Sequence, residues 1–316
     1  MKLRRLLGAL VGCLMVVSVP GTALADELDD RLGRSSQAEF SGDQEIRCVT
    51  PDEELSQVVT VVQANGRLEV RGPSMTVVVH GREVSSHATG GATTAVVVPT
   101  ASPAQRDDRY EVVVAGQSVE LGRTVEVIEI HEGDLVRMVY AFDLSTGAAL
   151  RVESRNDDGT TYCETRYVSF TAGAPYVPQA GEGTIEMDEA VPADEVDTEV
   201  LPDELAGFRR TDVYRGPEDS VVGYYSDGVF TFSLLASDRP LAVAELADRP
   251  TSQVGDAEYQ RAFEPGRVVL VWESPLGGYA LVGDLPLDLQ AEVLTDLPQP
   301  ASGGLLQSFW DNLFGG

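Results

Sequence analysis

Lysine is almost missing from this chain, and histidine is scarce. Lys2 is the single lysine among 316 residues. No domain downstream of it can therefore hold a Walker A loop, a Schiff-base lysine or a Ser-x-x-Lys base. The three histidines, His80, His87 and His131, are not paired at the spacing of a metal site, and neither an HExxH nor a GxSxG motif occurs. We therefore predict a protein that is not an enzyme and that holds no metal ion or cofactor.

Positive charge is also in short supply. The chain has 23 lysine and arginine residues against 51 aspartate and glutamate residues, and its formal net charge is −28. Such a charge repels nucleic acid and anionic lipid headgroups, so we predict no nucleic-acid partner. Long hydrophobic runs are missing past residue 25, where no apolar stretch reaches the roughly 20 residues that a membrane-spanning helix needs.

The first 25 residues have the three parts of a secretory signal peptide. A basic segment at residues 2–5 precedes an apolar run at residues 6–19, and residues 23–25 (Ala-Leu-Ala) form a small-x-small cleavage signal. We predict export, cleavage near Ala25, and a soluble protein in the periplasm or another extracytoplasmic space. Cleavage would remove three basic residues and no acidic one, so the formal charge would become −31. The alternative is a lipid anchor at Cys13, because residues 10–13 (Leu-Val-Gly-Cys) resemble a lipobox.

Two cysteines, Cys48 and Cys163, remain after such a cleavage. An even pair in an exported chain predicts one disulfide. The alternative is a pair of unpaired thiols.

Short segments rich in valine, threonine, isoleucine and tyrosine recur from residue 38 to residue 170, between turns such as Asn65-Gly66. They predict an antiparallel meander with strands at 57–63, 75–80, 94–98, 110–115, 124–130, 135–144, 149–154 and 162–170. Further strands are predicted at 207–214, 220–225, 229–235, 267–272 and 278–282. Short helices are predicted at 26–36 and 287–294. In the strand 135–144, apolar side chains alternate with Arg137 and Asp143, which we expect on the opposite face of a half-buried strand.

An acidic segment rich in proline and glycine separates the two groups of strands. We predict a signal peptide (1–25), a first domain (26–172), this linker (173–200), a second domain (201–297), and a flexible spacer with an amphipathic tail (298–316). Apolar pairs in the tail recur every four residues, which predicts a helix that docks into a partner groove or onto the protein itself. Its larger side chains at these positions are Phe309, Trp310, Leu313 and Phe314.

Several segments resemble the RseB/MucB family, whose first domain is LolA-like. In the stretch 110–170, Asp143-Leu144-Ser145-Thr146-Gly147 and the following Leu150-Arg151-Val152-Glu153 are similar to a hairpin of that family. In the second domain, Leu201-Pro202 with Gly207-Phe208, and the run 224–233 (YYSDGVFTFS), resemble motifs of the RseB C-terminal domain. The resemblance covers most of residues 27–297. It implies a mainly β (α+β) protein with a curved antiparallel LolA-like sheet or half-barrel and short helices, plus a smaller antiparallel sheet domain with a helix.

The resemblance also implies a function. RseB-like proteins bind the extracytoplasmic part of a membrane-bound anti-sigma factor, shield it from proteolysis, and are thought to release it when a lipid-like signal binds. The resemblance implies the same partner here, with a lipid or acyl chain as a possible ligand. The alternative is a lipid or lipoprotein carrier of the LolA type, which needs an apolar cavity open to solvent. Candidate partner or ligand contacts in the second domain are Tyr225, Ser226, Asp227, Gly228 and Phe230.

Overall fold

The computed structural model describes most of the chain between its two terminal segments. The described residues are 27–51, 53–73, 75–80, 83–88, 93–97, 108–173, 200–215, 220–238, 250–263, 267–283 and 285–301. The signal peptide with Cys13, nearly all of the acidic linker, and the tail with Phe309, Trp310, Leu313 and Phe314 lie outside these residues. What we predict for those segments stays a prediction.

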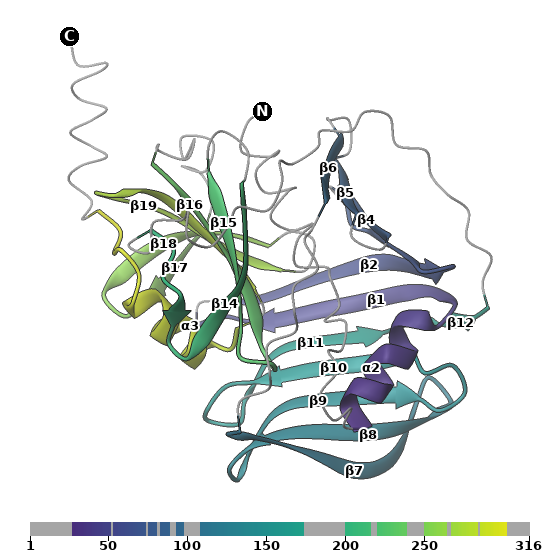
Figure 1. Ribbon diagram of the computed structural model, residues 1–316. Helices are drawn as coiled ribbons and strands as arrows, with labels where there is room; N and C mark the ends of the chain where they lie inside the picture. The colour runs from purple at the N-terminus through teal and green to yellow at the C-terminus, as the bar shows by residue number, and fades with distance from the viewer. Residues whose placement is uncertain are drawn as a thin grey trace.

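The first sheet has twelve strands, and every described neighbour pair is antiparallel (Figure 1). The spatial order is β6-β5-β4-β3-β2-β1-β11-β10-β9-β8-β7, and the short β12 also pairs with β1. The path does not close, so β6 and β7 are its two ends. The bounds are β1 Phe40–Val49, β2 Glu54–Ala64, β3 Arg67–Arg71, β4 Met75–His80, β5 Glu83–Ala88, β6 Thr93–Val97, β7 Tyr110–Glu120, β8 Arg123–Glu132, β9 Leu135–Asp143, β10 Ala149–Arg155, β11 Thr161–Tyr167 and β12 Thr171–Ala172.

The second sheet has eight antiparallel strands in the order β13-β14-β15-β16-β20-β19-β18-β17. Its central strands are buried on both faces, as their continuous apolar sequences demand. The bounds are β13 Glu204–Leu205, β14 Phe208–Arg215, β15 Val221–Ser226, β16 Thr231–Ser237, β17 Thr251–Val254, β18 Ala257–Phe263, β19 Val268–Ser274 and β20 Gly277–Gly283.

Two described helices accompany the sheets, α2 (Glu27–Gln37) and α3 (Leu287–Thr295). Helix α2 lies across the strands of the first sheet (Figure 1). Its Leu28 is buried in the apolar core, and its Arg31 pairs with Glu126 of β8 at 2.5 Å. The side chain of Gln63, on β2, donates a hydrogen bond of 2.6 Å to the carbonyl of Ser35 in α2. Among the described residues, neither helix has the length and apolar character that a membrane crossing requires.

The mainly β fold class is confirmed, with two antiparallel sheets, an unclosed first sheet and few helices. The turn at Asn65-Gly66 joins β2 to β3, and both residues have positive φ (54° and 69°), as a two-residue type I′ hairpin requires.

The expectation that Arg137 and Asp143 lie on the polar face of a half-buried strand is wrong. Arg137 is 0% exposed and Asp143 is 2% exposed. The register of β9 with β8 shifts beside Arg137, since Ile130 pairs with Met138 and His131 with Val136, so the alternation is interrupted there. Residues on both faces of β9 are buried. The second domain covers the start of the strand, where Arg137 contacts α3, and Asp143 closes the turn that follows the strand.

Cys48 on β1 and Cys163 on β11 lie directly opposite each other in the register and form a disulfide. Both cysteines are buried, with 1% and 7% exposure. The predicted disulfide is confirmed. It joins two central strands whose positions in the sequence are 115 residues apart.

Candidate functional site

The most elaborate cluster of side-chain contacts lies where the second domain meets the first sheet. Its second-domain part is the turn Ser226-Asp227-Gly228 between β15 and β16. One carboxylate oxygen of Asp227, Oδ1, accepts hydrogen bonds from the backbone N–H groups of Val229 (2.9 Å) and Phe230 (2.7 Å). Gly228 has a φ of 88°, a conformation that a side chain would strain. An aspartate followed by a glycine is therefore what the geometry of this turn needs.

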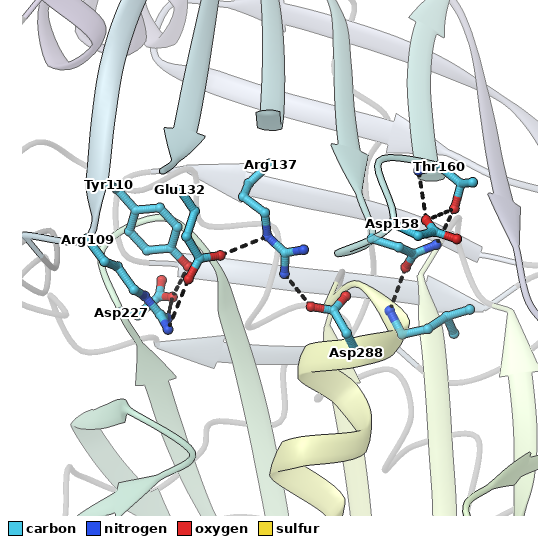
Figure 2. Close-up of polar contacts among 10 residues, drawn as sticks. Arg109, Tyr110, Glu132, Arg137, Asp158, Thr160, Asp227 and Asp288 are labelled. Atoms are coloured by element: carbon cyan, nitrogen blue, oxygen red, sulfur yellow. Dashed lines mark hydrogen bonds and ion pairs between the residues drawn. The ribbon is translucent and has the colours of Figure 1, made fainter. Parts of the chain in front are cut away.

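The other carboxylate oxygen of Asp227 binds the first domain. Oδ2 accepts hydrogen bonds from Arg109 Nη2 and from the Tyr110 hydroxyl, both at 2.7 Å (Figure 2). Burial, together with the Asp227 carboxylate, raises the pKa of Tyr110 well above its usual range, so the hydroxyl remains a donor. The Tyr110 ring also packs edge-on to Phe230, with ring centroids 6.3 Å apart. One aspartate thus holds its own turn and ties it to the start of β7.

A second ion pair, also partly buried, lies beside the first. Arg137, at the start of β9, donates from Nη2 to Asp288 Oδ2 at 2.6 Å, and its Nε lies 3.3 Å from Glu132 Oε2 (Figure 2). Asp288 belongs to the first turn of α3, where a carboxylate is favoured by the helix dipole. The Arg137 guanidinium also lies 5.7 Å from the ring centroid of Phe230. Phe230 therefore contacts both halves of the cluster.

Two further contacts extend the junction. The backbone N–H of Leu287 donates to Asn156 Oδ1 at 2.9 Å, which attaches the start of α3 to the β10–β11 turn. That turn is itself closed by Asp158, whose Oδ1 accepts from the backbone N–H of Thr160 at 2.8 Å (Figure 2). On the other side, Arg261 of β18 donates to Thr50 Oγ1 at 2.9 Å and pairs with Glu53. Contacts at several separate points fix the orientation of the two domains far better than one contact would.

Chemically, this arrangement is suited to holding surfaces in place. Removing one partner of a buried ion pair leaves an uncompensated charge, which is strongly unfavourable. In the part of the chain that the structure describes, no group of histidine, cysteine, aspartate or glutamate side chains is arranged to hold a metal ion. The residues described below as the junction cluster are Arg109, Tyr110, Glu132, Arg137, Asp227, Phe230 and Asp288.

The five second-domain candidates from the sequence come together here, and four of them are buried, whereas Gly228 is partly exposed. Tyr225 is 0% exposed, stacks on Phe232 with centroids 4.9 Å apart, and donates from its hydroxyl to the carbonyl of Pro202 at 2.8 Å. Ser226, Asp227 and Phe230 are also buried. Their role in contacting a partner stays a prediction. What the structure does assign to them is the internal contact between the domains.

Sequence reasoning missed the first-domain half of the cluster. Arg109 and Tyr110 look like an ordinary strand start, and Asp288 like an ordinary first-turn acid. Arg137 did carry a signal, since it stands in a strand whose neighbours are otherwise almost all apolar. A charge in such a place indicates a buried partner when the strand is covered on both faces.

A pocket of about 650 Å³ lies between α2 and the turn that follows β9. Asp143 organises this turn. Burial alone would raise the pKa of its carboxyl, but hydrogen bonds from Arg123, Thr146 and Ser145 outweigh that effect and hold the pKa well below its usual range. The lining is mixed rather than apolar: Asp29, Asp30, Arg31, Gly33, Arg34, Gln37, Ala38, Phe142, Asp143, Leu144, Ser145, Thr146 and Gly147.

No family model and no curated protein matches this chain. Solved structures do. The complex of Pseudomonas aeruginosa MucA and MucB is 20% identical over 86% of this chain and 99% of that chain, with a TM-score of 0.45. The chain is similar to MucB. A crystal structure of MucB alone is also 20% identical, covers 84% of this chain and 96% of that one, and has a TM-score of 0.46.

A LolA-superfamily protein from Nitrosomonas europaea is a more distant match. It is 8% identical, covers 80% of this chain and 89% of that one, and has a TM-score of 0.20. The solved structures thus include both groups that the sequence motifs resemble. At these identities and scores the similarity concerns the backbone fold alone and gives no evidence about activity or partners.

Proposed function

We propose that this protein is an exported, non-enzymatic regulator. In this proposal it binds the extracytoplasmic part of a membrane-bound anti-sigma factor and shields that part from proteolysis. The signal peptide at residues 1–25 supplies export, and the family-like motifs of both domains supply the kind of partner. The family-like motifs are spread over residues 27–297, and this range contains the described strands of both sheets.

The observation that carries the proposal is the hydrogen bond between Tyr110 and Asp227. Tyr110 opens the family-like stretch of the first domain, and Asp227 is the acid of the family-like YSDG run in the second. The two resembling segments therefore meet in one buried cluster, as expected if both belong to one binding unit. A chance likeness of isolated hairpins gives no reason for such a meeting.

The proposed mechanism needs no chemical step by this chain. Binding covers a segment of the partner and so keeps a protease from it. The junction cluster would fix the angle between the two domains and thereby preorganise a surface that spans both. Preorganisation raises affinity because less conformational freedom is lost on binding.

The test is co-purification from the native envelope. The tagged, mature chain is recovered from detergent-solubilised membranes, and bound proteins are identified by mass spectrometry. We expect a membrane protein with a cytoplasmic sigma-binding domain. Adding the purified chain to that partner should then slow cleavage of the partner's extracytoplasmic part by the envelope protease.

Two variants make this test specific. Asp227→Asn removes the anionic acceptor for Arg109 and should weaken partner capture, whereas Asp256→Asn, at an exposed turn of the same domain, should leave it unchanged. A chain truncated after Ala301 tests whether the predicted docking tail contributes. Recovery of no anti-sigma factor, or unchanged cleavage in the presence of the chain, would contradict the proposal.

The alternative of a lipid carrier has less support among the described residues. The pocket beside α2 has a mixed lining, in which charged and polar side chains lie beside Ala38, Phe142 and Leu144, so it is not the predominantly apolar cavity that suits an acyl chain. Native mass spectrometry of the mature protein from the envelope distinguishes the two. A co-purified lipid without any anti-sigma factor would favour the carrier.

A further inference from the structure

The two sheets have four end strands, and one of them differs from the rest. β13, β17 and β6 have two, four and five residues, whereas β7 has eleven. Figure 1 shows β7 along the lower margin of the first sheet. Proteins usually protect sheet ends by keeping them short or by placing lysine or proline on them. β7 has neither residue, although its register with β8 contains a bulge between Val114 and Gly116. Among the described strands it pairs only with β8.

The side chains of β7 add apolar surface to this edge. Val114 is 46% exposed and Val119 is 68% exposed. Their register partners on β8 are Ile128 and Thr124, which are four residues apart on a regular strand. Both valines therefore point to the same face of the sheet. Leu121, in the turn directly after β7, is 47% exposed. An edge of this kind offers backbone groups for pairing and side-chain positions for specificity.

Charge indicates what fits there. Glu111 and Glu120 lie on β7 itself, and its neighbour β8 contributes three further glutamates. Several of these glutamates are already paired: Glu120 with Arg151, Glu126 with Arg31, and Glu132 with Arg109 and Arg137. Glu111 is the exposed carboxylate of β7 itself. A second copy of this chain would bring a formal charge of −28 against the same charge. Electrostatic complementarity instead favours a segment rich in arginine or lysine.

We propose that β7 accepts an extended, basic segment of another protein as an added strand. The added strand would pair with the outer backbone edge of Tyr110–Glu120, with apolar side chains against Val114 and Val119 and a cationic one toward the exposed Glu111. This surface is remote from the junction cluster's contacts with the second domain except at its first residue. The inference goes beyond the proposed function and does not require it.

The test uses the mature full chain and a short synthetic peptide in which valine alternates with arginine. Binding is measured by calorimetry, and the site is located by hydrogen exchange of the β7 backbone. We expect slower exchange across Tyr110–Glu120 on binding. A peptide of the same length with glutamate in place of arginine should not bind. A valine–arginine peptide with its backbone nitrogens methylated along both edges should bind at least about tenfold more weakly, because neither edge can then donate hydrogen bonds to β7.

Matched variants separate the edge from the rest of the surface. Val119→Lys places a blunting cation on the edge strand and should weaken peptide binding by about tenfold or more. Val58→Lys adds the same charge to another exposed valine, 53% exposed on the internal strand β2, and should change binding less than twofold.

Three results would overturn the inference. The first is equal binding of the methylated and unmethylated peptides. The second is unchanged exchange across β7 when the peptide binds. The third is a dimer in sedimentation that Val119→Lys abolishes, because a second copy would then be the occupant. Each result can be obtained whether or not an anti-sigma factor is recovered from the envelope.

Discussion

The two sheets are stabilised in different ways. In the second sheet, β16 and β20 have six buried residues in succession, and Phe232, Leu281 and Val282 are 0% exposed. In the first sheet, β7 has a single buried residue, and an outer face carries ion pairs such as Arg151 with Glu153. The first sheet also has the disulfide. Apolar burial therefore dominates one sheet, while the other adds a covalent link and contacts from the second domain.

The difference shows why the junction cluster matters more to the first sheet. A wide open sheet with one largely polar face has less apolar area to bury per residue. The disulfide at β1 and the junction contacts at β9 and at the start of β7 compensate for that smaller apolar burial. The second sheet needs no such fixing, because its core strands are already covered on both faces.

The largest expected effect comes from removing the cross-link in the first sheet. The double variant Cys48→Ala/Cys163→Ala should lose about 4–5 kcal/mol of unfolding free energy, because a closed loop of this length restricts the unfolded chain. Denaturant unfolding followed by circular dichroism measures the loss. In a Trp310→Phe background, Trp272 fluorescence reports on the second sheet alone. If the denaturant midpoint from Trp272 fluorescence falls as far as the midpoint from circular dichroism, the disulfide stabilises both sheets equally, which would contradict the difference between them.

A change in the core of the second sheet should be nearly as costly. Phe232→Ala empties a position with 0% exposure that contacts Tyr225 and Phe208, and should cost about 3–5 kcal/mol. Leu276→Ala, at a side chain that is 61% exposed, should cost less than about 0.5 kcal/mol. Thermal unfolding of both variants makes the comparison. Equal losses would mean that apolar burial does not dominate this sheet.

A smaller loss is expected at the junction. Asp227→Asn should cost about 2–3 kcal/mol, since a buried carboxylate that accepts from Arg109, Tyr110 and its own turn is replaced by an amide. The informative readout is the difference between two unfolding midpoints, one from Trp272 fluorescence and one from circular dichroism. We expect this difference to be larger in Asp227→Asn than in the Asp256→Asn control. Coincident midpoints in both variants would show that the cluster does not couple the sheets.

The smallest effect is a pH dependence within the first sheet. The folded-state pKa of Asp143 lies below its ordinary value of 3.8, so its contribution to stability is complete above that value and is lost as the pH falls further. Asp143→Asn should therefore be less stable than the parent at neutral pH, and the difference should shrink below about pH 4. Acid titration followed by circular dichroism tests this, with the exposed Asp134→Asn as control. A difference that stays constant down to the most acid pH would exclude the assigned cause.

Much of the fold follows from local patterns in the chain. The Asn65-Gly66 turn, the apolar run of β16 and the short helix α3 all have signals within a few residues of themselves. The environment of the strand 135–144 does not follow from such local patterns. A register shift beside Arg137 interrupts its alternation, and whether Arg137 faces water or a carboxylate depends on Asp288, which lies 151 residues away in sequence. Periodicity describes one strand and carries no information about what covers it.

Only the second-domain part of the candidate site can be predicted from the sequence. The run around Asp227 is recognisable because an aspartate and a glycine are needed within one turn. Its partners Arg109 and Tyr110 are common residues at a common place, and only the meeting of the two domains gives them a role.

The sequence by itself determined the absence of lysine-based chemistry, the acidic surface, the two groups of strands and the cysteine pair. These properties depend on composition and on neighbours along the chain. The tertiary structure alone decided that Tyr225, Ser226, Asp227 and Phe230 are buried, that Arg137 is buried against α3, and that β7 is one of the two end strands of the first sheet. Those outcomes depend on which distant segments pack together, and packing is settled only when burial, charge pairing and hydrogen bonding are satisfied across the whole molecule at once.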